Sequence, residues 1–150
     1  MVNGLATTFT PSNTPSNSNL NQTTWLSALT INDLLNQGSK VIIDTTSNGT
    51  GSGNITVNSS INKTAGSEAS LTLNAHSNIV LNSSISSSSA ALNLNLNSDT
   101  DGNGSGATSL ASGASLSLNG GTVTANGSIS MAVSALIKDR SEEHTSELQS

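Results

Sequence analysis

Cysteine and tyrosine are absent from this sequence, and large apolar side chains are scarce. The 150 residues include one tryptophan and one phenylalanine, and 33% of them are hydrophobic, against about 45–50% in an ordinary globular domain. Without cysteine, the chain can form neither a disulfide framework nor a thiolate metal site. Without many large side chains, it can hardly build the thick core of a compact α/β enzyme.

Charge is scarce as well. Charged residues make up 9% of the chain, with four Lys and Arg against nine Asp and Glu and a formal net charge of −5. This balance provides no cationic surface for phosphates, so we expect no nucleic-acid partner. It also argues against disorder, which usually combines low hydrophobicity with high net charge. The chain is dominated instead by 30 serines, 20 asparagines and 18 threonines.

Neither a signal peptide nor a membrane span is predicted. The first ten residues, MVNGLATTFT, lack both a basic and an apolar region, and a signal peptide contains both. No apolar run approaches the roughly 20 residues that cross a bilayer. We therefore expect no membrane span, and we expect any export signal to lie upstream of this sequence.

The last eleven residues, RSEEHTSELQS, differ in composition from the rest. They contain one of the four basic and three of the nine acidic residues. The string resembles the translation of a common sequencing adapter, so it carries no functional argument. We expect residues 139–150 to be an artefactual disordered tail, and the biological sequence to continue beyond Asp139 in a longer protein.

The N-terminal part divides into a linker and one short helix. Residues 1–23 are rich in Ser, Thr, Asn and Pro and show no period, which predicts a linker or an extended segment. The next segment, Trp25–Gly38, is the one helical candidate. Thr30 is the predicted N-cap, with Asp33 in the first turn. Gly38 is expected to end the helix.

Short strands are predicted after the helix. The β-branched run Lys40–Thr45 indicates a strand, and the Gly-, Ser- and Asn-rich residues 47–53 indicate a turn. NITVNSSI, starting at Asn54, then returns as NIVLNSSI, starting at Asn78, with six of eight positions identical. Apolar and polar residues alternate in both copies, as in strands with one buried face.

Weaker repeats extend the pattern toward the C-terminus. NSSI at Asn82 returns as NGSI at Asn126, an interval slightly less than twice the first, which would hold two repeats. LTLN at Leu71 returns as LSLN at Leu116, and the run ALNLNLN over residues 91–97 alternates strictly. Self-similarity at the interval that separates Asn54 from Asn78 is typical of repeat architectures.

The repeats predict an all-β solenoid over residues 24–138. Each strand has only two or three inward Ile, Leu or Val side chains, too few to offset the entropy of ordering it alone. If strands stack in parallel register at roughly 4.8 Å, Ile55 and Val57 lie over Ile79 and Leu81. The shared core is then a narrow aliphatic column, which needs no aromatic side chains.

Asparagines mark the predicted corners of the solenoid. Asparagine tolerates left-handed backbone conformations, and its amide can bond to the same residue type in the next turn of the solenoid. The asparagines concerned are Asn54, Asn58, Asn74, Asn78 and Asn82.

One family resembles these segments. The run from Asn54 to Ser87, with the later strings LNLNLNSDTDGNGSGATSL and LNGGTVTANG, resembles the β-helical shaft of filamentous-haemagglutinin-like proteins, the large exoproteins of bacterial two-partner secretion systems. The string WLSALTINDLLNQGSKVIIDTTS resembles a segment that often introduces such a shaft. The resemblance covers about residues 24–130. It implies a right-handed parallel β-helix, here with one short N-terminal helix.

The resemblance also implies a function without catalysis. It implies a secreted or surface-attached adhesin, which a two-partner transporter exports across the outer membrane through an N-terminal domain not contained in this sequence. Its shaft would be a rigid spacer and a contact surface for glycans or proteins of host or neighbouring cells. Two alternatives stay open: the stalk of a contact-dependent toxin, and a β-helical polysaccharide-processing enzyme.

The string DTDGNG matches the first half of a calcium loop. Asp99, Asp101 and Asn103 would provide the oxygen ligands, and Gly104 would form the sharp turn. The twelfth position, normally Glu, is Leu110, so only weak calcium binding is expected. The alternative is an exposed Gly, Asp and Asn loop that bulges from the solenoid. No other cofactor is expected.

Catalytic residues are not predicted. Acid–base or nucleophilic chemistry needs a histidine or a pair of carboxylates with a partner in reach. His76, the one histidine outside the C-terminal tail, is expected at a surface turn, and Trp25 is expected to anchor the helix rather than to stack on a sugar. The remaining acidic residues are few and scattered along the sequence: Asp33, Asp44, Glu68, Asp99 and Asp101.

Overall fold

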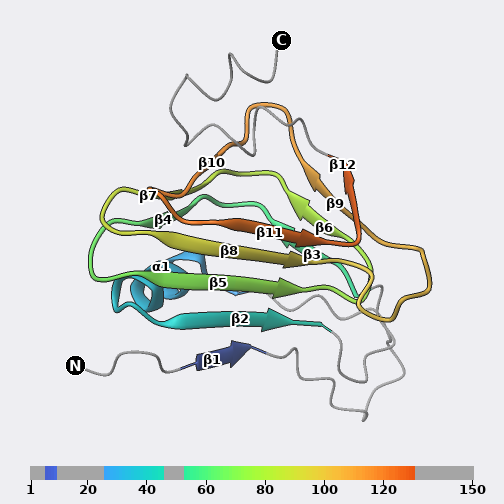
Figure 1. The fold of residues 1–150 in the computed structure, drawn as a ribbon, viewed down its shortest axis with the longest axis horizontal. Coiled ribbons are helices and arrows are strands. Elements are labelled where there is room, and N and C mark those ends of the chain that lie inside the picture. The colour runs from blue at the N-terminus through green and yellow to red at the C-terminus, as the bar shows by residue number, and fades with distance from the viewer. Residues whose placement is uncertain (1–5, 10–25, 46–52, 131–150) are drawn as a thin grey trace.

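The computed structural model describes residues 6–9, 26–45 and 53–130. This part of the chain is mostly β, with parallel sheets and one short helix (Figure 1). The five-stranded sheet contains, in spatial order, β1 (Ala6–Phe9), β2 (Lys40–Asp44), β5 (Ala69–Asn74), β8 (Leu92–Asn97) and β11 (Val123–Asn126). The four-stranded sheet contains β12 (Ser128–Ser130), β9 (Ala107–Leu110), β6 (Ile79–Leu81) and β3 (Ile55–Val57). The three-stranded sheet contains β10 (Leu116–Ser117), β7 (Ile85–Ser87) and β4 (Ile61–Lys63).

The chain visits the three sheets in a repeating order. β2 lies in the five-stranded sheet, β3 in the four-stranded sheet and β4 in the three-stranded sheet, and β5 then returns to pair with β2. The same order continues through β12. We call one set of three successive strands, one from each sheet, a rung. Parallel neighbours need a long connection between them, and here the other two strands of the rung provide it.

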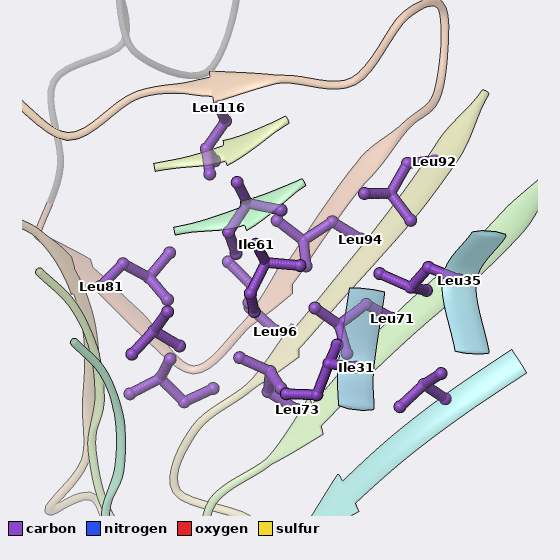
Figure 2. Packing of buried hydrophobic residues seen from close by; sticks show 14 of the residues in the cluster. Ile31, Leu35, Ile61, Leu71, Leu73, Leu81, Leu92, Leu94, Leu96 and Leu116 are labelled. Atoms are coloured by element: carbon purple, nitrogen blue, oxygen red, sulfur yellow. The ribbon is translucent and has the colours of Figure 1, made fainter. Parts of the chain in front are cut away.

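The predicted stacking of the two closest repeats is confirmed. Ile55 lies opposite Ile79 and Val57 lies opposite Leu81, and all four side chains are buried. Figure 2 shows such side chains, from strands of all three sheets and from the helix, pointing into one interior. As predicted, this core is aliphatic; its buried members are Ile31, Leu35, Val41, Ile55, Val57, Ile61, Ala69, Leu71, Leu73, Ala75, Ile79, Leu81, Ile85, Leu92, Leu94, Leu96, Leu116 and Leu118.

The strand register that the two weaker repeats imply is wrong. Ile129, from the NGSI string, lies opposite Thr108 in the four-stranded sheet, whereas Ile85, from NSSI, lies in the three-stranded sheet. Leu116, from the LSLN string, pairs with Ile85, whereas the LTLN string belongs to the five-stranded sheet.

Unequal rung lengths explain this error. Ile55 of β3 lies opposite Ile79 of β6, and Ile79 in turn lies opposite Thr108 of β9. The path along the chain from Ile79 to Thr108 is longer than the path from Ile55 to Ile79. A fixed interval therefore assigns later strands to the wrong sheet.

The helix α1 (Ala28–Asn36) begins earlier than predicted. Its N-cap is Ser27, whose Oγ accepts a hydrogen bond from the Leu29 backbone N–H at 3.2 Å. The predicted N-cap at Thr30 is therefore wrong, because Thr30 lies inside the helix. The first turn holds no acidic residue, so the prediction for Asp33 is also wrong.

The core explains this earlier start. Ile31 and Leu35 lie four residues apart on one face of α1, and both are buried, so the turn that carries Ile31 must already be helical. Gly38 ends the helix as predicted. Its φ of +74° lets the Ser39 N–H reach the Leu34 carbonyl at 3.2 Å, the hydrogen bond of a Schellman motif.

The helix also covers an open strand edge. β4 is the last strand of the three-stranded sheet, and α1 packs beside it. The Asn62 N–H donates to Asn32 Oδ1 at 2.9 Å. The N–H groups of Thr64 and Ala65 donate to Asn36 Oδ1 at 2.8 and 3.0 Å. Helix side chains thus replace the missing neighbouring strand and protect this edge.

Other sequence predictions fall at the margins of the described residues. The strand predicted over Lys40–Thr45 is confirmed as β2. Within the predicted linker or extended segment, residues 1–23, the strand β1 pairs in parallel with β2. Trp25, nearly all of the predicted turn at 47–53 and the predicted tail at 139–150 lie outside the described residues. Among the described residues, no helix has the length and the apolar character that a membrane crossing requires.

Candidate functional site

The outer face of the five-stranded sheet is mostly polar. Buried and half-buried residues alternate along β5 and β8, so every second side chain points outward. These outward residues lie opposite one another in register, with Ser70 beside Asn93, Thr72 beside Asn95 and Asn74 beside Asn97. On β2, Lys40, Ile42 and Asp44 occupy the same rows. Charge therefore occurs on the β2 side of this face, and β5 and β8 present amides and hydroxyls.

A ladder of asparagines runs along one end of this face. The Asn126 Nδ2 donates to Asn97 Oδ1 at 2.7 Å, and the Asn97 Nδ2 donates to Asn74 Oδ1 at 2.7 Å. The Asn74 Nδ2 donates to Asp44 Oδ2 at 3.4 Å. Every amide in the ladder donates toward the earlier rung, and the carboxylate of Asp44 accepts at its end. The ladder ties four rungs together through side chains alone.

The predicted corner asparagines form two further pairs. The Asn78 Nδ2 donates to Asn54 Oδ1 at 3.1 Å, and the Asn82 Nδ2 donates to Asn58 Oδ1 at 2.8 Å. The prediction that these amides bond between turns is thus confirmed. The expected left-handed backbone is wrong for them, because the described non-glycine residues with positive φ are Asp99 and Asn119.

A shallow hollow lies beside the end of α1. It is lined by residues that include Gly38, Lys40, Glu68, Ser70 and Asn93. The Asn93 amide bridges three rungs there, because its Nδ2 donates to Glu68 Oε1 at 2.6 Å and its Oδ1 accepts from the Thr122 N–H at 3.0 Å. These groups hold one another in place, and Lys40, which also lines the hollow, is exposed.

The calcium-loop candidates lie in the loop between β8 and β9, which projects sideways from the sheets beyond the carboxyl end of β8 (Figure 1). The Gly104 N–H donates to Asp99 Oδ2 at 3.0 Å. The Asn103 amide donates from Nδ2 to Asp101 Oδ2, and its Oδ1 accepts from the Ser105 N–H at 2.7 Å. The loop is thus organised by hydrogen bonds of its own side chains.

His76 joins this loop to the preceding rung. Its Nε2 lies 3.0 Å from Asp101 Oδ2, and the His76 side chain is 46% exposed. Burial raises the pKa of the Asp101 carboxyl, but hydrogen bonds from the backbone N–H and the side-chain amide of Asn103 lower it. The charge of His76 lowers it further. The pKa of Asp101 therefore lies below its ordinary value, which favours the ionised carboxylate.

The structure brings all three calcium candidates together, with His76 beside them. Leu110, at the twelfth loop position, lies in β9 and packs against the core, so the bidentate carboxylate of a calcium loop is missing there. Among the described residues, no group of three or more His, Cys, Asp or Glu side chains is arranged to hold a metal ion. Calcium binding by Asp99, Asp101 and Asn103 stays a prediction.

Sequence reasoning expected His76 at a surface turn, which is confirmed, but missed its contact with Asp101. The two residues lie far apart in the sequence, and the loop that carries Asp101 interrupts the repeat, so no interval signals the pair. Two other described carboxylates have partners elsewhere: Asp44 ends the asparagine ladder and Glu68 bonds to Asn93.

A buried lysine was also missed. Lys63, on β4, has no exposed surface, and its ammonium donates to the carbonyls of Ala65 and Gly66. Burial lowers the pKa of Lys63, because desolvation disfavours the charged form. In the next rung, Ser87 lies opposite and donates to the Ala90 carbonyl. At the ends of β4 and β7, the side chains of Lys63 and Ser87 thus hold the chain segment that follows each strand.

The described residues define a protein of parallel strands in three sheets around one aliphatic core, with polar side chains bonded from rung to rung. Comparison of the chain with protein-family models, curated proteins and solved structures found no match. A fold by itself does not define a function, so the functional conclusion depends on the surface and the sites that these residues build.

Proposed function

We propose that the chain is a segment of a right-handed parallel β-helix that forms the shaft of a secreted or surface-attached bacterial adhesin of the filamentous haemagglutinin type. The observation that carries this proposal is the repeating order of the three sheets, in which every strand pairs in parallel with its counterpart one rung away. Crossover connections between parallel neighbours of one sheet are right-handed in nearly all known cases, which supports the proposed hand.

Stiffness follows from the bonding between rungs. Backbone hydrogen bonds join all three sheets from rung to rung, and side-chain ladders add a second set of connections. Each further rung adds the same set of contacts to its neighbour, as in other repeat proteins. A chain of this kind is suited to hold a distal part of an exoprotein away from the cell surface.

The contact surface in this proposal is the outer face of the five-stranded sheet. It offers rows of amides and hydroxyls with little charge, for example Thr72, Asn95 and Thr124 across three neighbouring strands. Such rows can hydrogen-bond to glycans or to exposed protein backbone. Single contacts of this sort are weak, but an array of them repeated along a shaft gains avidity.

Export and location belong to the same proposal. A two-partner transporter in the outer membrane would export the whole exoprotein through a separate N-terminal domain, and the partners would be glycans or proteins of host or neighbouring cells. The proposal includes no catalytic step on a substrate, and the polar groups of the contact surface bond to one another in ladders.

The proposal is tested by adhesion of protein-coated beads. Beads that carry many copies of the chain should be retained on cells or on a glycan array, because the coating restores multivalency. The substitution Asn95→Lys places a charge in the centre of the outer face and should reduce retention by about tenfold or more, since many weak contacts are lost together.

The matched control is Ser86→Lys. Ser86 points outward from β7, the central strand of the three-stranded sheet, so this charge lies on a different sheet. Retention of Ser86→Lys beads should equal that of the unchanged chain. Equal loss in both variants, or no retention of the unchanged chain on any surface, would contradict the proposed contact face.

A further inference from the structure

The loop between β8 and β9 carries an Asn–Gly dipeptide in an unusual setting. Asn103 and Gly104 are both exposed, and a side chain at Gly104 would meet nothing within 4 Å. We propose that Asn103 is a site of self-modification, at which the side-chain amide is converted to a carboxylate through a cyclic imide formed with Gly104. This inference is independent of the adhesive function.

The reaction needs no reagent other than water. The backbone nitrogen of Gly104 bonds to Cγ of Asn103 and loses its proton, and the Cγ–Nδ2 bond breaks, so that Nδ2 leaves with this proton as ammonia. Water then opens the five-membered imide at one of its two carbonyls. The product is aspartate or isoaspartate at position 103, with one more negative charge in the loop.

The electrophile is polarised by its neighbours. The Ser105 N–H donates to Asn103 Oδ1 at 2.7 Å, and this is the oxygen on which negative charge develops when the Gly104 nitrogen attacks Cγ. A hydrogen-bond donor aimed at a developing oxyanion lowers the barrier of acyl transfer. The donor is a backbone group, so it is already in place before the reaction begins.

A base is in contact with the nucleophile. The Gly104 N–H donates to Asp99 Oδ2 at 3.0 Å, and the proton of this N–H must leave for the Cγ–N bond to form. The Asp99 carboxylate is therefore within the distance that general-base catalysis requires. An amide nitrogen is a poor nucleophile until it begins to lose its proton, so this contact acts on the difficult part of the reaction.

The leaving group also has a partner. Asn103 Nδ2 donates to Asp101 Oδ2, and the same carboxylate oxygen contacts His76 at 3.0 Å. Positive charge develops on Nδ2 as it takes up a proton and departs. An adjacent carboxylate stabilises this charge. Electrophile, nucleophile and leaving group of one cyclisation thus each have a hydrogen-bond partner.

Two other described Asn–Gly pairs provide internal controls. Asn126 ends β11, and its Nδ2 donates to the amide oxygen of Asn97 in the asparagine ladder instead of to a carboxylate. Asn119 has a φ of +52° and precedes Gly120 in a turn. The two pairs report the rate of the same dipeptide at a strand end and in a turn, outside the loop that carries Asp99 and Asp101.

The test is incubation of the purified chain at neutral pH and physiological temperature, with peptide mapping by mass spectrometry over time. Asn103 should gain about 1 Da, the difference between amide and acid. Its half-time should be shorter than those of Asn126 and Asn119 by about tenfold or more, since a positioned base commonly contributes at least this much. Conversion of Asn103 at the rate of Asn126, or more slowly, would overturn the proposal.

The substitution Asp99→Asn removes the proposed base and keeps the Asn103–Gly104 dipeptide. Asp99 has a φ of +56°, which asparagine adopts as readily as aspartate, so the loop backbone is retained. Conversion of Asn103 should slow by about tenfold or more, whereas conversion of Asn126 stays unchanged. An unchanged rate at Asn103 would show that the Asp99 carboxylate has no such role.

The matched control is Asp44→Asn. It removes a carboxylate from the outer face of β2, away from the loop, and the rate at Asn103 should not change. Far-UV circular dichroism of each variant checks that the β structure is retained. Equal slowing of Asn103 by both substitutions would indicate a general effect of charge and would contradict the proposed base.

Discussion

Thr108 departs from the pattern of the residues around it. It lies in register between Ile79 of β6 and Ile129 of β12, and its side chain is fully buried. Its Oγ1 has no hydrogen-bond partner. A buried hydroxyl without a partner costs free energy because it has lost its water. This position therefore lowers stability although its shape fits the column.

The substitution Thr108→Val should stabilise the chain. It keeps the branched shape at Cβ and removes the unpaired hydroxyl, so the free energy of unfolding should rise by about 1 kcal/mol. Urea unfolding measures this change. Ser109→Ala on the same strand is the control, since Ser109 is only half-buried, and its effect should stay within about 0.5 kcal/mol. A lower midpoint for Thr108→Val would contradict the assignment.

At this scale, contacts between residues of the repeats were predictable from the sequence, and contacts of loop residues were not. Asparagine amides were expected to bond between turns, and those of Asn78 and Asn82 do so. The contact of His76 with Asp101 was not foreseeable. Side chains on strands follow the strand register, whereas those on a loop follow the path of the loop, which no periodicity describes.

Among the elements, the helix shows how tertiary contacts select between local signals. Ser27 and Thr30 are both suitable N-caps by residue type. The helix starts after Ser27 because the core needs Ile31 and Leu35 on the inner face of α1. Asn32 and Asn36 then meet the edge of β4.

Substitution at the two candidate caps distinguishes them. Ser27→Ala should lower the free energy of unfolding by about 1 kcal/mol, because the Leu29 N–H loses its acceptor. Thr30→Ala replaces an exposed residue within the first turn with a better helix former and should change stability by no more than about 0.5 kcal/mol. Chemical denaturation of both variants measures the difference. A larger loss for Thr30→Ala would show that the helix begins there.

The loop between β8 and β9, unlike the helix, could not be placed from the sequence. It interrupts the repeat and lengthens the rung that leads from Ile79 of β6 to Thr108 of β9, so that strands after it could not be placed by counting. It also brings polar side chains together, namely Asp99, Asp101 and Asn103 with His76 beside them. Loops on a rigid scaffold commonly carry such chemistry.

For the whole molecule, one continuous core joins the three sheets and the helix. No rung could bury its few apolar side chains alone, so the rungs depend on one another. The described part should therefore gain or lose its structure as a unit. Its surface, in contrast, is built from polar rows whose side chains bond from rung to rung.

Far-UV circular dichroism of the chain truncated after Lys138 measures this dependence. The spectrum at neutral pH should be mainly β, and heating should remove the β signal in one cooperative transition, because the core is a single cluster. The full chain is the control and should melt at the same temperature, since the removed residues are predicted to be a disordered tail. A coil spectrum for the truncated chain would support disorder instead.

The sequence by itself determined that the strands are short, that one face of each is apolar and that neighbouring repeats stack, as Ile55 over Ile79 shows. These features follow from alternation and from self-similarity, which are local or nearly local. Only the tertiary structure decided the register after the β8–β9 loop, the start of α1, the burial of Lys63 and the pairing of His76 with Asp101. Each of these depends on which surfaces meet across rungs of unequal length. The spacing of residues along the chain does not predict these meetings.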